Sequence, residues 1–255
     1  MNTVFNHPLP LFAVSIAVLW SSAWIASSVV KRRRDLEEEA REDFDLVTGA
    51  ALTLLGLLIG FAFSMAIQRY DQRKHYEETE ANAISTEVLR AGLLPPGDAA
   101  ALRTQLRNYL DQRISFYLTT DRQRLSEINA HTAQLQRDLW SAVQGAASAQ
   151  PNAIVGLALS GMNDVLNAQG FTQAAWWNRI PYSAWWLMAL LAICCNLLVG
   201  YRARKTQTRS ILLLILPLIV SAAFLLIADM DSPRGGLIHV HPDNLLSLAA
   251  ALSAS

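Results

Sequence analysis

Few of the residues that could carry out chemistry lie together in this sequence. His75 is followed by Glu77, Glu78 and Glu80, and positions three apart share one face of a helix. Zinc requires three or four convergent ligands, so a pair such as His75 and Glu78 falls short. We interpret the segment as a solvated, charged helix face. The sequence predicts no metal site and no cofactor.

Motifs that would indicate catalysis are also missing. The sequence contains no Walker loop for phosphate, no GxSxG elbow, no HExxH zinc motif and no GxGxxG dinucleotide loop. His239 and His241 could form a pH-sensing or metal-binding pair, although a short polar tail at a membrane surface is the favoured interpretation. Cys194 and Cys195 lie in an apolar run and are interpreted as small buried side chains. We therefore expect no enzyme.

The composition indicates a protein that is embedded in lipid. The 255 residues include 21 Lys and Arg against 21 Asp and Glu. The net charge is therefore zero, and no nucleic-acid partner is expected. Charged residues make up 16% of the chain and apolar residues 52%, whereas soluble domains carry roughly 25% charged residues. A bilayer must therefore solvate part of the surface.

Four apolar runs without Lys, Arg, Asp or Glu are long enough to cross a membrane, at residues 8–30, 46–67, 183–201 and 211–228. Between the second and third runs, eleven basic and eleven acidic residues accompany apolar side chains that recur at helical spacing. No window alternates like a β-strand. The predicted fold is an all-α membrane protein with four transmembrane helices and a helical domain inserted between spans two and three.

The predicted parts are 1–67 with transmembrane helices 1 and 2 and a short charged loop, 68–182 as an extramembrane α-helical domain, 183–228 with transmembrane helices 3 and 4, and 229–255 as a C-terminal tail. The short loops 31–45 and 202–210 together contain nine Lys and Arg. Basic loops are retained in the cytoplasm, so we expect both loops there. The helical domain and both termini are expected outside, in the cell membrane, which is the inner membrane in a bacterium.

Two features within the spans indicate helix packing or a pore. Small residues follow one stripe of the second span, at Gly49, Gly56, Gly60 and Ser64, and such stripes allow close packing of helices. Alternatively, this span packs around a symmetry axis and a neighbouring stripe faces a pore. Asn196 is the strongest uncharged polar residue within a span and is expected to bond to another helix. A permeation or ligand site is the alternative for Asn196.

Charged residues next to the spans are candidates for ion pairs or for a pore mouth. Asp229 and Asp231 end the fourth span, where the carboxyl end of a helix disfavours anions. We therefore expect them to meet cations. The candidates in this group are Arg69, Asp71, Arg73, Asp229, Asp231 and Arg234.

Several segments together resemble the bacterial bestrophin-like family, which has no settled function. They are GFAFSMA at 60–66, RYDQR at 69–73, EANAI at 80–84, LRA at 89–91, LLP at 93–95 and DMDSPRGGLI at 229–238. The resemblance covers most of residues 46–240. This family is in turn distantly similar to bestrophins, which are pentameric anion channels with four spans and a helical domain.

The resemblance implies a pore on the second span. Bestrophins carry a Gly-Phe pair there and an Arg-aromatic pair nine residues later, and the pairs at 60–61 and 69–70 reproduce this spacing. The hydrophobic neck would then consist of Phe61, Leu57 and, as a polar departure from the family pattern, Thr53. A hydrophobic constriction can gate a channel by excluding water.

The implied function is an oligomeric bestrophin-like ion channel, with anions as the conducted class and Arg69 and Arg73 at its mouth. Its partners would be the lipid bilayer, inorganic ions and further copies of itself in a homo-oligomer, a pentamer by the same resemblance. Two features of this chain depart from bestrophins. The helical domain and termini of bestrophins are cytoplasmic, whereas here we expect them outside. Animal bestrophins also have an acidic calcium clasp, for which Asp229 and Asp231 are too few. The alternative function is a membrane-anchored helical sensor or interaction module that conducts no ion.

Overall fold

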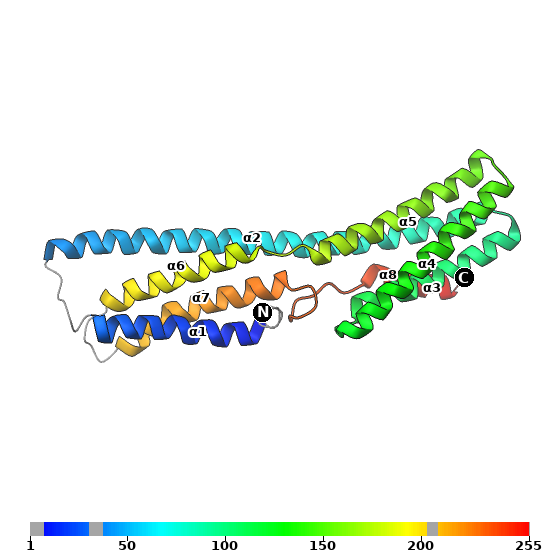
Figure 1. Cartoon of the computed structure of the whole chain (residues 1–255). Helices are drawn as coiled ribbons and strands as arrows, with labels where there is room; N and C mark the ends of the chain where they lie inside the picture. The colour runs from blue at the N-terminus through cyan, green and yellow to red at the C-terminus, as the bar shows by residue number, and fades with distance from the viewer. Residues whose placement is uncertain (1–7, 31–37, 203–208, 255) are drawn as a thin grey trace. The chain divides into compact units, whose positions relative to one another are not determined.

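The computed structural model describes residues 8–30, 38–202 and 209–254 (Figure 1). Every regular element among these residues is a helix, as predicted. The elements are α1 (Pro8–Ile25), η1 (Ala26–Val30), α2 (Glu38–Arg90), η2 (Ala91–Leu93), α3 (Pro96–Leu118), α4 (Arg122–Ala149), α5 (Ala153–Trp177), α6 (Tyr182–Arg202), α7 (Arg209–Asp231) and α8 (Asp243–Ala254).

The chain forms two compact units. The first, here called the membrane unit, comprises residues 1–69 and 179–239, and the second, the helical unit, comprises residues 70–178 and 240–255. Helix α2 contributes its first part to the membrane unit and the remainder to the helical unit. Residues 31–37 and 203–208, which make up most of the two short basic loops, lie outside the described residues.

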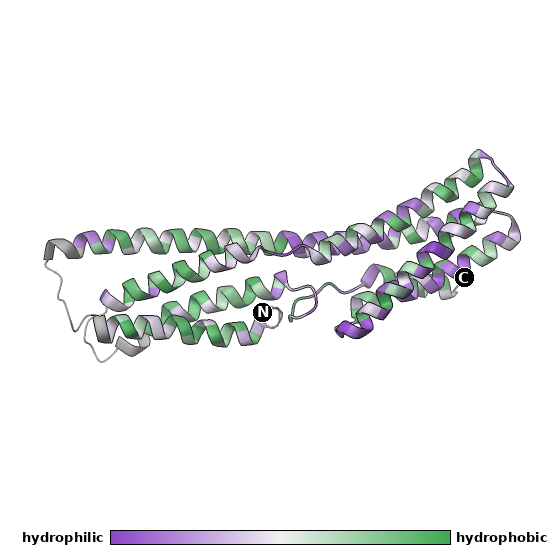
Figure 2. Ribbon diagram, viewed as in Figure 1, coloured by the Kyte–Doolittle hydropathy of each residue, from purple (hydrophilic) through white to green (hydrophobic). Residues whose placement is uncertain are grey.

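The membrane unit contains the four predicted spans. Each predicted run falls within a helix that is long and apolar enough to cross a bilayer, in α1, α2, α6 and α7. Figure 2 shows these stretches as apolar around most of their circumference, which is the pattern of helices that face lipid. The four-span helical membrane fold is therefore confirmed.

Helices α1, α6 and α7 pack against one another in the membrane unit. At Gly200 of α6 a Cβ atom would lie 2.8 Å from the carbonyl carbon of Ala23 on α1. No side chain fits there, so glycine permits the two backbones to approach. The buried apolar side chains of this unit include Leu19, Leu55, Trp185, Met188, Phe224 and Ile227.

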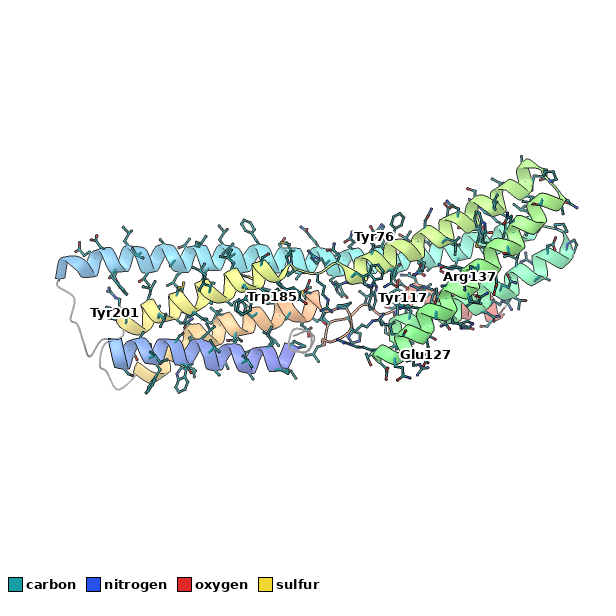
Figure 3. The ribbon with its side chains drawn as sticks, viewed as in Figure 1. Tyr76, Tyr117, Glu127, Arg137, Trp185 and Tyr201 are labelled. Atoms are coloured by element: carbon teal, nitrogen blue, oxygen red, sulfur yellow. The ribbon has the colours of Figure 1, made fainter. Side chains whose placement is uncertain are left out.

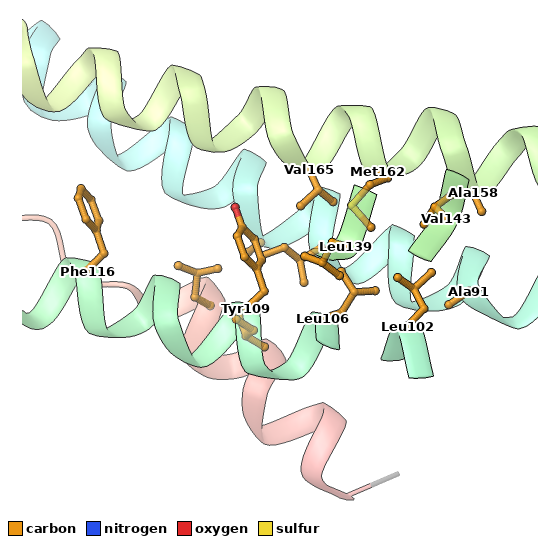
Figure 4. Close-up of a cluster of buried hydrophobic side chains, with 14 of the residues drawn as sticks. Ala91, Leu102, Leu106, Tyr109, Phe116, Leu139, Val143, Ala158, Met162 and Val165 are labelled. Atoms are coloured by element: carbon orange, nitrogen blue, oxygen red, sulfur yellow. The ribbon is translucent and has the colours of Figure 1, made fainter. Parts of the chain in front are cut away.

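The helical unit is built from the second part of α2 with α3, α4, α5 and α8. Two of its helices start at side-chain caps, because Asp121 accepts from the amides of Gln123 and Arg124 at α4 and Asn152 accepts from those of Ile154 and Val155 at α5. Figure 4 shows the apolar core between these helices, which includes Leu102, Leu106, Phe116, Leu139, Val143, Met162 and Val165.

The C-terminal segment differs from the predicted tail. Residues 243–254 form α8, and residues 240–255 belong to the helical unit. Leu245 of α8 is fully buried, and α8 packs against α3. The segment is therefore a part of the helical core, held there by apolar burial and by a cap described below.

Candidate functional site

The predicted neck residues lie on the part of α2 that belongs to the membrane unit. The side chains of Leu57 and Phe61 are 52% and 59% exposed, and Thr53 is exposed as well. The opposite face of the same helix carries Leu55 and Ala66, which are buried against the other spans. The described residues of the chain therefore leave the neck stripe uncovered.

The small-residue stripe lies beside the neck stripe and is equally open. A Cβ atom added at Gly49, Gly56 or Gly60 would meet no described atom within 4 Å, and Ser64 is exposed. The hydroxyl of Thr53 donates to the carbonyl of Gly49, 2.9 Å away on its own helix. Within the described chain these residues pack against no neighbouring helix, so the packing stripe stays a prediction that concerns other molecules.

The segment after α7 folds back onto Asp229. The carboxylate of Asp229 accepts from the backbone amides of Leu237 at 2.7 Å and Ile238 at 2.8 Å. Gly236 permits this turn, because a Cβ there would lie 2.8 Å from the carboxyl carbon of Asp229. Asp231 accepts from the amide of Ile180 at 3.0 Å. Both aspartates thus accept hydrogen bonds from backbone amides at the end of the fourth span. Ion pairs that involve these two aspartates stay a prediction.

The remaining charged candidates have different surroundings. Arg69 and Arg234 are half-buried, whereas Asp71 is exposed. Arg73 is fully buried in the helical unit, where its Nε donates to the carbonyl of Ala175 at 3.4 Å. Arg73 therefore ties α2 to α5 in this chain.

Asn196 is completely buried in α6. Its Nδ2 donates to the carbonyl of Ala192 one turn earlier, at 2.8 Å. Its Oδ1 has no hydrogen-bond partner among the described residues. This oxygen can therefore accept a hydrogen bond from a donor outside the described residues.

The acidic segment of α2 is not the solvated face that the sequence suggested. His75 and Glu78 are exposed, but Glu77 and Glu80 are buried. That interpretation is wrong for these two glutamates because they belong to the core-facing stripe of α2. The stripe is Arg73, Glu77, Glu80, Ile84, Glu87 and Ala91, all buried and spaced alternately four and three residues apart.

Glu80 is the centre of a buried polar network. Its carboxylate forms a salt bridge with the Nε of Arg113 and accepts from Nη2 of Arg113 at 3.3 Å. Tyr117 donates to it at 3.3 Å and Thr172 at 3.1 Å. Figure 3 marks Tyr117 in this unit. Three helices, α2, α3 and α5, thus meet at one carboxylate.

Burial and the Glu80 charge shift the titration of the groups around Glu80. Burial raises the pKa of Tyr117 and the negative charge of Glu80 raises it further, so the phenol stays protonated. Burial alone would lower the pKa of Arg113, but the Glu80 carboxylate, with Tyr109 and Tyr117, outweighs burial and raises it. Arg113 therefore keeps its positive charge although it is buried.

Glu77 holds the first turn of α8. Its two carboxylate oxygens accept from the backbone amide of Leu245 at 3.0 Å and from the side-chain amide of Asn244 at 2.6 Å. An anion at a helix N-terminus satisfies free amides and opposes the positive end of the helix dipole. Glu77 is thus a cap supplied from another helix, which a local reading of the sequence cannot find.

Glu87 is a buried carboxyl group without a hydrogen-bond partner among the described residues. Burial raises its pKa to about 8, although Arg90 lowers it in part and Asp164 raises it. Nothing in the sequence marks this position except its place on the buried stripe of α2. The described residues contain no group of three or more His, Cys, Asp or Glu that could hold a metal ion.

Comparison with solved structures shows a shared fold. A crystal structure of a bacterial bestrophin homologue from Klebsiella pneumoniae matches with a TM-score of 0.68 at 13% identity, covering 96% of this chain and 97% of that one. A single-residue variant of that homologue matches with a TM-score of 0.65 at 14% identity, covering 100% and 98%. A further crystal structure, of a membrane protein, matches with a TM-score of 0.69 at 13% identity, covering 95% and 97%.

No curated protein matches the chain by sequence. The bestrophin-like domain, however, matches residues 13–245, which is most of the chain. This match includes most of the first span, the other three spans, the buried stripe of α2 and the turn that folds onto Asp229. The chain therefore belongs to the bestrophin-like domain family.

Proposed function

We propose that the protein is an oligomeric ion channel whose neck is formed by Thr53, Leu57 and Phe61 of α2. The observation that carries the proposal is the open stripe in the second span. Two large apolar side chains and a threonine lie there uncovered, beside glycines that would let identical helices approach around an axis. Further copies of the chain would cover the glycines and leave the neck stripe facing the axis.

The proposed neck acts by controlling water. A ring of Leu57 and Phe61 side chains would narrow the path to an apolar constriction, which ions cross only when it is wetted. Thr53 would end the constriction with a polar ring. Arg69 is proposed to supply positive potential near the mouth, which favours anions over cations. We propose a homo-oligomer, a pentamer if the assembly follows that of bestrophins.

Flux through liposomes that contain the purified protein tests the channel. We expect chloride flux from the wild type and a several-fold higher flux from Phe61→Ala, because a smaller side chain widens the constriction and keeps it wet. Ile219→Ala is the matched control, since Ile219 of α7 is equally exposed at 60% but lies on another span. Sodium flux measured in the same vesicles decides the selectivity.

Two results would contradict the proposal. Equal flux from Phe61→Ala and Ile219→Ala would remove Phe61 from the conduction path. Absence of anion and cation flux from a folded oligomer would favour the second candidate, a membrane-anchored sensor or interaction module without conduction. The observation in favour of that candidate is the helical unit, which buries the carboxyl groups of Glu77, Glu80 and Glu87.

A further inference from the structure

Glu87 lies where α2 packs tightly against Gly161 of α5 in the helical unit. Its side chain is fully buried, and neither carboxyl oxygen has a hydrogen-bond partner among the described residues. Gly161 of α5 faces it, and a Cβ atom at Gly161 would overlap the Glu87 carboxylate and the Arg90 guanidinium. The two helices therefore pack directly over this carboxyl group, with no space for a larger neighbour.

Five charged side chains of α2, α3 and α5 lie on the helices near this contact. On α2 itself, Arg90 follows Glu87 by one turn, and its Nη1 reaches Oδ2 of Asp164 on α5 at 3.5 Å. From α3, Arg103 donates to the carbonyl of Val88 at 3.4 Å. Glu80, two turns earlier on α2, is neutralised by Arg113. Arg90 is thus the one cation near Glu87 that also links α2 to α5.

We propose that Glu87 is a proton-binding site of the helical unit, and that loss of its proton loosens the packing of α5 against α2 around Gly161. A buried, unpartnered carboxyl group is tolerated as the neutral acid but is costly as the anion. When the O–H bond breaks and the proton passes to solvent, the anion draws the nearest cation, which is Arg90. Arg90 then leaves Asp164, and this ion pair between the two helices is lost, while the bonds of Arg73 and Glu80 to α5 remain.

The pH range in which this would occur is physiological. Burial raises the pKa of Glu87 to about 8, so the neutral acid dominates at pH 7 and the anion above pH 8. The expected direction is therefore tight packing at low pH and a loosened α5 at high pH. The device does not depend on conduction, and it acts in the helical unit whether or not the membrane unit forms a pore.

Hydrogen exchange of the full-length protein in lipid nanodiscs tests the proposal. We expect the protection factors of residues 84–91 and 158–165, corrected for the intrinsic pH dependence of exchange, to fall at least several-fold between pH 6.5 and 9. Glu87→Gln keeps the shape and removes the titration, so its protection should not change with pH. Glu78→Gln removes an exposed carboxylate of the same helix and should respond like the wild type.

Two further variants predict shifts of opposite sign. Asp164 raises the pKa of Glu87 and Arg90 lowers it. Asp164→Asn should therefore lower the pH at which Glu87 loses its proton, and Arg90→Gln should raise it, both read from the infrared band of the protonated acid described below, because either variant removes the ion pair between the helices at every pH. Shifts in the same direction, or none, would overturn the proposal even if Glu87→Gln itself failed to fold.

Infrared spectroscopy reads the proton directly. The wild type at pH 6.5 should show the carbonyl stretch of a protonated carboxylic acid that is absent from Glu87→Gln and disappears from the wild type at pH 9. Identical bands in both proteins would show that Glu87 is ionised throughout and would contradict the proposal. Loosening of α5 that persists in Glu87→Gln would contradict it as well.

Discussion

At the scale of single residues, the core of the helical unit contains charged side chains that are buried away from water. Glu80 and Arg113 are both fully buried and bound to each other. A buried pair of this kind contributes little net stability, but removing one partner strands the other charge. The free energy of unfolding should therefore fall much more when one of the two side chains is replaced than when both are replaced.

A double-mutant cycle tests this expectation. We expect Glu80→Met and Arg113→Met each to lower the free energy of unfolding by about 3–5 kcal/mol, because each leaves an uncompensated buried charge. The double variant should be closer to the wild type than either single variant. Chemical unfolding of the purified protein in detergent measures all four. Additive losses would show that the two charges are independent.

Glu87 predicts a pH dependence of stability that differs in sign from that of a paired carboxylate. Its pKa is raised from 4.5 to about 8 in the folded chain, so between these values the folded state binds more protons than the unfolded state. Stability then falls as pH rises, by about 1.4 kcal/mol for each pH unit from this one group. Subtracting the unfolding curve of Glu87→Gln isolates that slope. A difference that rises with pH, or stays flat, would refute the assignment.

The buried charges were also the residues that sequence analysis missed. A glutamate in a run such as Tyr-Glu-Glu-Thr-Glu is usually solvated, and local composition favours that interpretation. The signal that could have found Glu77, Glu80 and Glu87 is their spacing with Ile84 and Ala91, which continues the core stripe of α2. The partners of Glu77 and Glu80, which are Arg113, Thr172 and Leu245, are far away in the sequence, so these contacts could not be predicted from it.

At the scale of helices, glycines separate two kinds of packing. Gly200 of α6 is in direct contact with the backbone of Ala23 within one chain, whereas Gly56 of α2 faces open space. The first glycine should matter for the fold of each chain. The second should matter only where another molecule covers it.

One substitution at each glycine distinguishes these roles. Gly200→Ala should destabilise the chain by about 1–3 kcal/mol, because rigid backbone atoms cannot move aside for the added methyl group. Gly56→Leu should leave the thermal stability of the separate chain unchanged and reduce the mass of the assembly, measured by light scattering in detergent. An unchanged assembly in Gly56→Leu would mean that the stripe faces lipid.

Helix α8 is the one long helix of the described residues that the sequence did not predict. Pro242 and Asp243 precede a run of Leu and Ala, which is an ordinary helix start, yet the segment was predicted to be a tail because it follows the last span. The four spans, in contrast, were predicted correctly because length and the absence of charge suffice to identify a transmembrane helix. Docking of α8 depends on Glu77, 168 residues from the Leu245 amide that it accepts from.

At the scale of the whole molecule, family membership and the fold are established, and the orientation in the membrane is an expectation from charge. Nine basic residues in the loops 31–45 and 202–210 favour the cytoplasm for both. Three basic residues that follow the second span favour the opposite orientation. They are Arg69, Arg73 and Lys74. Burial of Arg73 against Ala175 weakens that objection, because a side chain bonded within the folded unit contributes less to retention at the surface.

A pair of reporter fusions after Ser255 decides the orientation. We expect an alkaline phosphatase fusion to be active, because that enzyme folds only outside the cytoplasm, and a fusion to a fluorescent protein that requires the cytoplasm to be dark. The same fusions after residue 202, in the second basic loop, should give the opposite pattern and serve as the control. A fluorescent C-terminus would place the helical unit and its Glu87 in the cytoplasm, where pH is buffered. The proton site would then respond to metabolic pH, whereas an outside location would expose it to the changing pH of the surroundings.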